Sequence, residues 1–134
     1  LNKNNLVVYG SRVLKGDLRT RPSGLRPYFS MFANYMLTKI SNILNGQNLT
    51  DAHTCYKAFY TETLQSIKLE ENGFGFCPEV TAKISKLGIV IIETSIDYYG
   101  RNYSDGKKIK LIHAFEALYV IFKYNYPYNK KLKF

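Results

Sequence analysis

The sequence contains few cysteines, and their arrangement excludes two common kinds of small protein. Cys55 and Cys77 are the two cysteines in 134 residues, which is too few for a disulfide framework. No CxxC motif or cluster of His and Cys indicates a zinc site, so we interpret both as reduced thiols in a cytosolic protein. No apolar run approaches the roughly 18 residues of a membrane span, and no signal peptide is present. We expect a cytoplasmic location, either free or peripheral on the inner face of the membrane.

Acidic residues are also scarce. The chain has 10 Asp and Glu against 19 Lys and Arg, which gives a net charge of +9. This balance favours an anionic partner, such as nucleic acid, an acidic membrane face or a phosphorylated small molecule. Apolar residues make up 46% of the chain, with 12 Tyr and 8 Phe, and this composition predicts one compact, well-packed domain.

The order of predicted elements is that of an α/β protein. Apolar periodicity, β-branched runs and Gly or Pro punctuation predict strands at 5–9, 56–60 and 89–96 and helices at 28–44, 61–67, 78–87 and 111–122. The apolar stripe of the first helix is either core or a membrane-facing surface. The first strand begins almost at once and the chain does not begin with Met, so we expect a preceding segment in the natural protein.

Polar residues that suit a site gather in four places. The first place is Gly10 to Arg12, and the second is Thr50 and Asp51 with Thr54. The third is Glu79, and the fourth is Arg101 with Lys107 and Lys108. Three of the four follow a predicted strand or open a predicted helix, where open α/β sheets bind their ligands. The stretch "YGRNYSDGKKI" at 99–109 is interpreted as a basic loop that closes over phosphates, with a solvated turn as the alternative.

A metal site is not predicted from the two histidines. His53 and His113 are far apart in the chain and no third ligand accompanies either of them. A buried Glu is usually paired and structural, and a lone loop Asp is usually a turn residue, so each acidic candidate also has a structural interpretation.

Six motifs in order resemble a known family. "VVYGSR", an amphipathic helix after a basic loop, "LTDAHTCYKAF", "FGFCPEVTAKISKLG", "IIETSIDYYGR" and "GKKI" are similar to the C-terminal half of family 2 glycosyltransferases, of the dolichyl-phosphate mannose synthase-like and polyprenyl-phosphate glycosyltransferase-like kind. The resemblance covers about residues 5–125. It implies a GT-A (Rossmann-like) fold whose N-terminal half binds a nucleotide sugar and whose Asp-x-Asp motif holds Mg²⁺ or Mn²⁺.

This sequence contains no Asp-x-Asp motif. The resemblance therefore implies that residues 1–134 are an acceptor-side fragment that lacks the nucleotide-binding half. The divalent metal is expected in the full-length enzyme and not on this chain alone, and the fragment by itself is expected to be inactive.

The resemblance also implies roles for the basic residues. Arg12 would lie beside the donor diphosphate or the acceptor phosphate, and Arg26 would contact the acceptor phosphate. Arg101 matches the arginine after the "EvPI.Y" strand of the family. Lys107 and Lys108 match the basic residue of its "GeSK" segment.

Asp51 and Glu79 are the catalytic candidates that the resemblance implies. Asp51 precedes the family's "sGF" segment, which is replaced here by Thr54, Cys55 and Tyr56. Asp51 would orient the acceptor, assist the metal or act as a base, and Glu79 would open the helix that borders the acceptor site. A hydroxyl acceptor needs one of them as a base, whereas a lipid phosphate is already an anion and needs none.

The predicted function is thus the inverting transfer of a sugar from a nucleotide-sugar donor to a lipid-phosphate or saccharide acceptor. One alternative is a non-catalytic basic module that binds nucleic acid or another anionic partner, although no RNP segment or GXXG loop supports it. Another is a degenerate remnant. An open strand edge at residues 5–9 is also expected, through which copies of the chain would associate.

Overall fold

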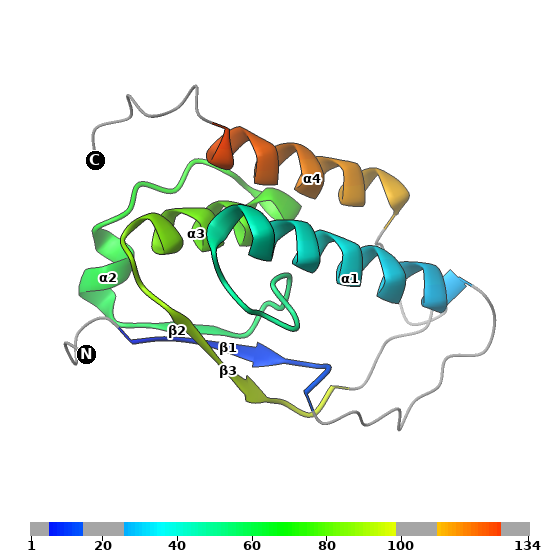
Figure 1. The fold of residues 1–134 in the computed structure, drawn as a ribbon, viewed down its shortest axis with the longest axis horizontal. Helices are drawn as coiled ribbons and strands as arrows, with labels where there is room; N and C mark the ends of the chain where they lie inside the picture. The colour runs from blue at the N-terminus through cyan, green and yellow to red at the C-terminus, as the bar shows by residue number, and fades with distance from the viewer. Residues whose placement is uncertain (1–5, 15–25, 99–109, 127–134) are drawn as a thin grey trace.

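The structure is a computed structural model that describes residues 6–14, 26–98 and 110–126, without the side chains of Arg26 and Pro27. The predicted alternation of strands and helices is confirmed (Figure 1). In chain order the elements are strand β1 (Val7–Ser11), helix α1 (Arg26–Asn45), strand β2 (Lys57–Phe59), helix α2 (Thr61–Gln65), the 3-10 turn η2 (Gly73–Gly75), helix α3 (Phe76–Lys86), strand β3 (Ile91–Ser95) and helix α4 (Leu111–Asn125).

The three described strands form a small mixed sheet in the order β2-β1-β3. β1 runs antiparallel to β2, with Val7 opposite Phe59, and parallel to β3, with Val7 opposite Ile91. The expected open edge at residues 5–9 is therefore wrong, because β1 is hydrogen-bonded on both sides. Among the described strands the edges are β2 and β3.

The helices α1, α3 and α4 lie on one side of the sheet (Figure 1). Val7 and Tyr9 alternate with Val8 along β1, and only the first two are fully buried, because they face the helices. They pack in one core cluster with Val80 and Ile84 of α3 and Ile91 of β3. The neighbouring loops add Leu49, Ala52, Ile67 and Ile89 to this cluster. Ile92, which alternates with Ile91, is 48% exposed. The helices and this core therefore support one face of the sheet.

Glycines set the end of α1 and the close approach of β1 to its neighbours. Gly46 follows α1 with a φ of 65°, a left-handed conformation that ends the helix where the sequence predicted. Gly10 lies in β1, where an added Cβ would meet Ile96 Cγ2 at 2.7 Å and Tyr56 Cβ at 2.9 Å. A side chain at position 10 would push apart the segments that surround the end of β1.

Candidate functional site

Arg12 and Asp51 form a two-point ion pair at the end of β1. Arg12 directly follows the strand, and its Nε donates to Asp51 Oδ2 at 2.6 Å while its Nη2 donates to Asp51 Oδ1 at 2.8 Å. The backbone N–H of Arg12 also donates to Oδ2 at 3.2 Å. Because a planar guanidinium matches both oxygens of a carboxylate, this contact fixes the orientation of Arg12 as well as its position.

The Asp51 carboxylate lies on the inner side of this pair. Its side chain is fully buried, whereas the Arg12 side chain is 28% exposed. Asn34 of α1 adds a hydrogen bond from Nδ2 to Asp51 Oδ1 at 3.2 Å. Burial alone would raise the pKa of Asp51, but hydrogen bonds from Arg12 and Asn34 and the charge of Arg12 outweigh it and hold the pKa below its ordinary value. Asp51 is thus an ionised, fully engaged carboxylate and a poor proton acceptor.

The outer side of the pair faces an aromatic ring. The guanidinium carbon of Arg12 lies 5.2 Å from the ring centroid of Tyr98, which follows β3 and is half exposed. The hydrogen bonds to Asp51, together with its charge, outweigh the effect of burial and raise the pKa of Arg12, so that this side chain stays cationic. Two of its five N–H donors point to Asp51, and the partly exposed remainder of the guanidinium can meet an anion.

Ser11 and Thr50 tie the turn after β1 to the loop that carries Asp51. Their hydroxyl oxygens lie 2.6 Å apart. Ser11 Oγ also accepts the backbone N–H groups of Val13 at 3.2 Å and Leu14 at 3.3 Å. The buried hydroxyl of Ser11 therefore orders the turn on which Arg12 sits.

Glu93 of β3 contacts the same loop; it lies within the "IIETSIDYYGR" motif, but no role was predicted for it. Its carboxylate accepts the backbone N–H and the hydroxyl of Thr50, each at 2.8 Å, and the backbone N–H of Asp51 at 3.0 Å. A charged residue inside a β-branched strand is unusual, and that contrast was the available signal. The resemblance likewise implied no role for Ser11, Thr50 or Asn34.

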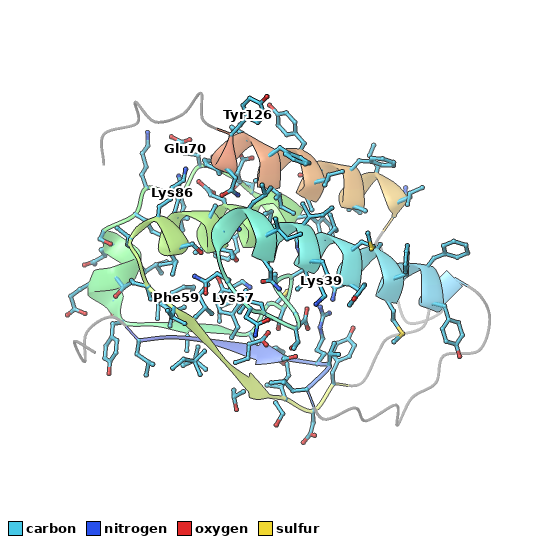
Figure 2. All side chains as sticks on the ribbon, in the orientation of Figure 1. Lys39, Lys57, Phe59, Glu70, Lys86 and Tyr126 are labelled. Atoms are coloured by element: carbon cyan, nitrogen blue, oxygen red, sulfur yellow. The ribbon has the colours of Figure 1, made fainter. Side chains whose placement is uncertain are left out.

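Glu79 lies in α3 and is not part of this cluster of contacts. Its buried carboxylate accepts the backbone N–H groups of Glu70 and Glu71, both at 2.8 Å, and pairs with Lys83 Nζ at 2.6 Å. Glu70 lies close to the end of α4 in Figure 2. Near that end of the helix, the hydroxyl of Tyr124 donates to Glu71 at 3.0 Å. With its oxygens committed to the segment before η2, Glu79 has a structural role in the described structure, and we leave it out of the proposed site.

Thr54 lies in the same loop as Asp51, three positions further along the chain. Thr54 is fully buried; its hydroxyl accepts the N–H of Tyr56 at 3.2 Å, and its carbonyl accepts the thiol of Cys77 at 3.6 Å. These contacts brace the loop between α1 and β2. The fully buried Thr54 side chain is not exposed to a substrate in the described structure.

Two basic side chains near Asp51 in the chain have lowered pKa values: His53 lies in the loop that carries Asp51, and Lys57 is the first residue of β2. Burial lowers the pKa of Lys57 to about 8, and its Nζ donates to Ala52 O at 2.9 Å and lies 3.6 Å from the Tyr9 ring centroid. Figure 2 shows Lys57 between the sheet and the helices. Burial, followed by the charge of Lys57, lowers the pKa of His53 to about 4, and His53 Nε2 is buried without a described hydrogen-bond partner. His53 is therefore neutral near pH 7.

The remaining predicted site residues carry no geometry here. Arg101, Lys107 and Lys108 lie outside the described residues, and Arg26 is described only as the first residue of α1. Within residues 6–14, 26–98 and 110–126, no three His, Cys, Asp or Glu side chains are arranged to hold a metal ion. The carboxylate of Asp51, for which assistance to the metal was one of the predicted roles, accepts hydrogen bonds from Arg12 and Asn34.

Helices α1 and α4 pack against each other yet expose many large apolar side chains. Phe29 and Phe32 of α1 are 71% and 62% exposed, and Phe115 and Tyr119 of α4 are 63% and 66% exposed. The full set, here called the α1/α4 apolar residues, is Tyr28, Phe29, Met31, Phe32, Tyr35, Met36, Ile43, Leu44, Leu111, Ile112, Phe115, Tyr119 and Phe122. None of the described helices combines the length and hydrophobicity that crossing a bilayer requires.

Two curated relatives to which the chain is similar are glycosyltransferases. It is 35% identical over 106 residues to an undecaprenyl-phosphate mannosyltransferase of Micrococcus luteus, a match that covers 77% of this chain and 42% of the relative. It is 26% identical over 95 residues to the low-salt glycan biosynthesis hexosyltransferase Agl6 of Haloferax volcanii, covering 71% of this chain and 22% of the relative. The predicted resemblance to family 2 glycosyltransferases is confirmed by these matches.

The matches cover only part of each relative. The chain spans less than half the length of the curated relatives it matches. No protein-family model matches the chain, and no solved structure matches it. The activity, substrates and partners of the whole protein are therefore proposals.

Proposed function

We propose that this chain is the acceptor-side part of a GT-A glycosyltransferase that transfers a sugar from a nucleotide-sugar donor to a lipid phosphate. The main observation behind the proposal is that the carboxylates of both candidate bases, Asp51 and Glu79, are already bound by other groups of the protein. Asp51 is buried, ionised and bound to Arg12, and Glu79 is buried and bound to Lys83 and two backbone N–H groups. Neither is placed to take a proton from a hydroxyl acceptor, whereas a phosphate attacks as an anion and needs no strong base.

A cation held in a fixed orientation suits such an acceptor. Arg12 is kept protonated and aimed by Asp51, and a guanidinium that still reaches solvent can hydrogen-bond to phosphate oxygens. Similarity to an enzyme named for undecaprenyl phosphate supports a phosphate acceptor of this kind. Arg26, Arg101, Lys107 and Lys108 are proposed as further phosphate contacts from the helix start and the 99–109 stretch.

The proposed reaction inverts the configuration at the sugar carbon, with a nucleoside diphosphate as leaving group. Fixed cations would stabilise the charge that develops on the two phosphate groups. Mg²⁺ or Mn²⁺, proposed for the nucleotide-binding half of the full-length enzyme, would neutralise part of the diphosphate charge when bound. The described residues do not form a ligand set for that ion, so this chain contributes positioning and positive charge.

We also propose that the α1/α4 apolar residues rest on the membrane surface. Two adjoining helices with exposed Phe, Tyr, Leu and Met, in a chain of net charge +9, match the composition that binds anionic bilayers at the interface. This placement would bring a lipid phosphate to the protein without a membrane span. A peripheral position on the cytoplasmic face follows from the same proposal.

The test uses the full-length natural protein with radiolabelled nucleotide sugars and, as separate acceptors, undecaprenyl phosphate and soluble saccharides. We expect an acid-labile lipid-linked sugar, inverted at the anomeric carbon, and a loss of about 100-fold in turnover for Arg12→Ala. Arg12→Lys keeps the charge but not the two-point contact, and we expect it to recover part of the activity.

Each other outcome identifies a different rival. Transfer to saccharides with undecaprenyl phosphate inert would overturn the lipid-phosphate acceptor. A folded full-length protein that transfers no sugar, yet binds nucleic acid in a salt-dependent way, would favour the basic binding module.

A further inference from the structure

Glu93 joins the sheet to the loop that holds Asp51. Both of its carboxylate oxygens are engaged, Oε2 by the N–H and hydroxyl of Thr50 and Oε1 by the N–H of Asp51. The contact partners are 42 and 43 positions away in the chain. One side chain thus binds two consecutive backbone N–H groups of a segment that has no place in the sheet itself.

The position of Glu93 in the sheet makes this link rigid. β3 pairs with β1 in parallel over five residue pairs, with Glu93 opposite Tyr9 and Ser95 opposite Ser11. Arg12 is the next residue after Ser11, so Arg12 is held at the end of the same strand pair. Glu93 therefore fixes the Asp51 segment to the strands that fix Arg12, and the Ser11–Thr50 contact closes the connection at 2.6 Å.

We propose that Glu93 is a positioning residue: by holding the Thr50–Asp51 backbone it sets the Asp51 carboxylate, which in turn aims the Arg12 guanidinium at the acceptor phosphate. This inference rests on the proposed function for its last step. Its first step, the hold on Thr50 and Asp51, concerns this chain alone. Glu93 acts through Thr50 and Asp51, whose backbone N–H groups it binds.

The effect on reaction geometry is expected to exceed the effect on stability. Glu93 is only partly buried and its contacts with Thr50 lie at the surface, where hydrogen bonds add little to the free energy of folding. A displacement of about 1 Å in a positioned group, in contrast, costs on the order of 100-fold in rate. A purely structural residue would instead lower the folded fraction and leave the kinetics of the folded enzyme unchanged.

The experiment compares wild type, Glu93→Ala and Glu93→Gln in the full-length protein, with Glu116→Gln on the surface of α4 as matched control. Hydrogen exchange read by mass spectrometry reports the amides of Thr50 and Asp51. We expect Glu93→Ala to speed their exchange at least tenfold, and Glu93→Gln, which keeps one acceptor oxygen, to lie between it and wild type.

Kinetics then test the link to Arg12. We expect Glu93→Ala to lower kcat/KM for undecaprenyl phosphate by about 30- to 100-fold with a raised KM for that acceptor, while the KM for the nucleotide sugar changes less than twofold. Glu116→Gln should match wild type in every readout. Unchanged exchange at Thr50 and Asp51, or an unchanged kcat/KM in an active enzyme, would overturn the inference. A wild type without transfer to undecaprenyl phosphate would overturn the proposed function, and the exchange result would still decide whether Glu93 holds Asp51.

Discussion

The guanidinium of Arg12 meets the carboxylate of Asp51 through two parallel contacts, at 2.6 and 2.8 Å, although the residues are 39 positions apart. The Asp51 side chain is fully buried and the Arg12 side chain is 28% exposed, so the pair has an inner and an outer side. This asymmetry separates two tasks. Asp51 orients, and Arg12 is the member that can still meet a ligand.

Removing the cation should destabilise the chain strongly. Arg12→Ala leaves the Asp51 carboxylate buried without its partner, and we expect a loss of about 3 kcal/mol in the free energy of unfolding, measured by urea denaturation. Arg12→Ala combined with Asp51→Asn removes the unpaired charge and should recover part of this loss. A change below about 0.5 kcal/mol for Arg12→Ala would show that the pair is not formed in solution.

Stability should fall on mild acidification because of His53. Its pKa is lowered from 6.5 to about 4 in the folded chain, so between these values the unfolded chain binds the proton and the folded chain does not. Unfolding is therefore favoured as pH falls from 6.5 to 4, by about 3 kcal/mol in total. Urea denaturation at pH 7, 6, 5 and 4.5 measures the slope.

The control for this slope is the other histidine. His53→Gln does not titrate in this range and should flatten the dependence between pH 6.5 and about 5, above the range in which Glu70 and Glu71, whose pKa values are lowered from 4.5, contribute. His113→Gln should keep the dependence. Equal slopes in wild type and His53→Gln would contradict the buried, neutral state of His53. The Asp51 carboxylate, whose pKa is lowered, acts in a separate window: its stabilisation is present above the ordinary value of 3.8 and is lost as pH falls further.

Local patterns were sufficient to predict the elements but not their pairing. Apolar periodicity and the left-handed glycine Gly46 placed α1, and a β-branched run placed β3, because these signals depend on nearby residues. The central position of β1 and the mixed sheet depend on which distant segments pair. The open edge at residues 5–9 was predicted from half of a parallel sheet, and no local pattern in the sequence indicated the antiparallel partner β2.

In the candidate site, too, individual residues could be predicted from the sequence but the contacts between them could not. Arg12 and Asp51 were predicted separately, from their places after a strand and in a polar loop, but their mutual contact spans 39 positions and has no local signature. Glu79 was predicted from its place at a helix start, yet its carboxylate faces backbone N–H groups of the preceding segment. Glu93 was missed because a strand pattern alone does not tell which loop a polar side chain will meet.

Replacing Glu79 of α3 or Glu116 of α4 by alanine should change the free energy of unfolding by different amounts. Glu79→Ala removes the carboxylate partner of Lys83, which keeps its contact with the carbonyl of Lys68, and leaves two backbone N–H groups without their acceptor. We expect a loss of about 3 kcal/mol in the free energy of unfolding. Glu116→Ala, with a half-exposed side chain, should cost at most about 0.5 kcal/mol. For the folded fraction of the full-length protein, both variants should keep kcat/KM within about twofold. A large loss of turnover in folded Glu79→Ala would restore Glu79 as a catalytic candidate.

Apolar contact with lipid should account for membrane binding by this chain. Phe32 and Phe115 stand exposed on α1 and α4, and burying part of each ring in a bilayer contributes about 1 kcal/mol or more. We expect Phe32→Ser combined with Phe115→Ser to weaken co-sedimentation with vesicles of phosphatidylglycerol and phosphatidylcholine by about thirtyfold. Val90→Ser replaces a 71% exposed apolar residue before β3, outside these two helices, and should bind as wild type does. If the double variant also binds as wild type does, the basic residues alone attract the chain to anionic lipid, and the α1/α4 apolar residues face another partner.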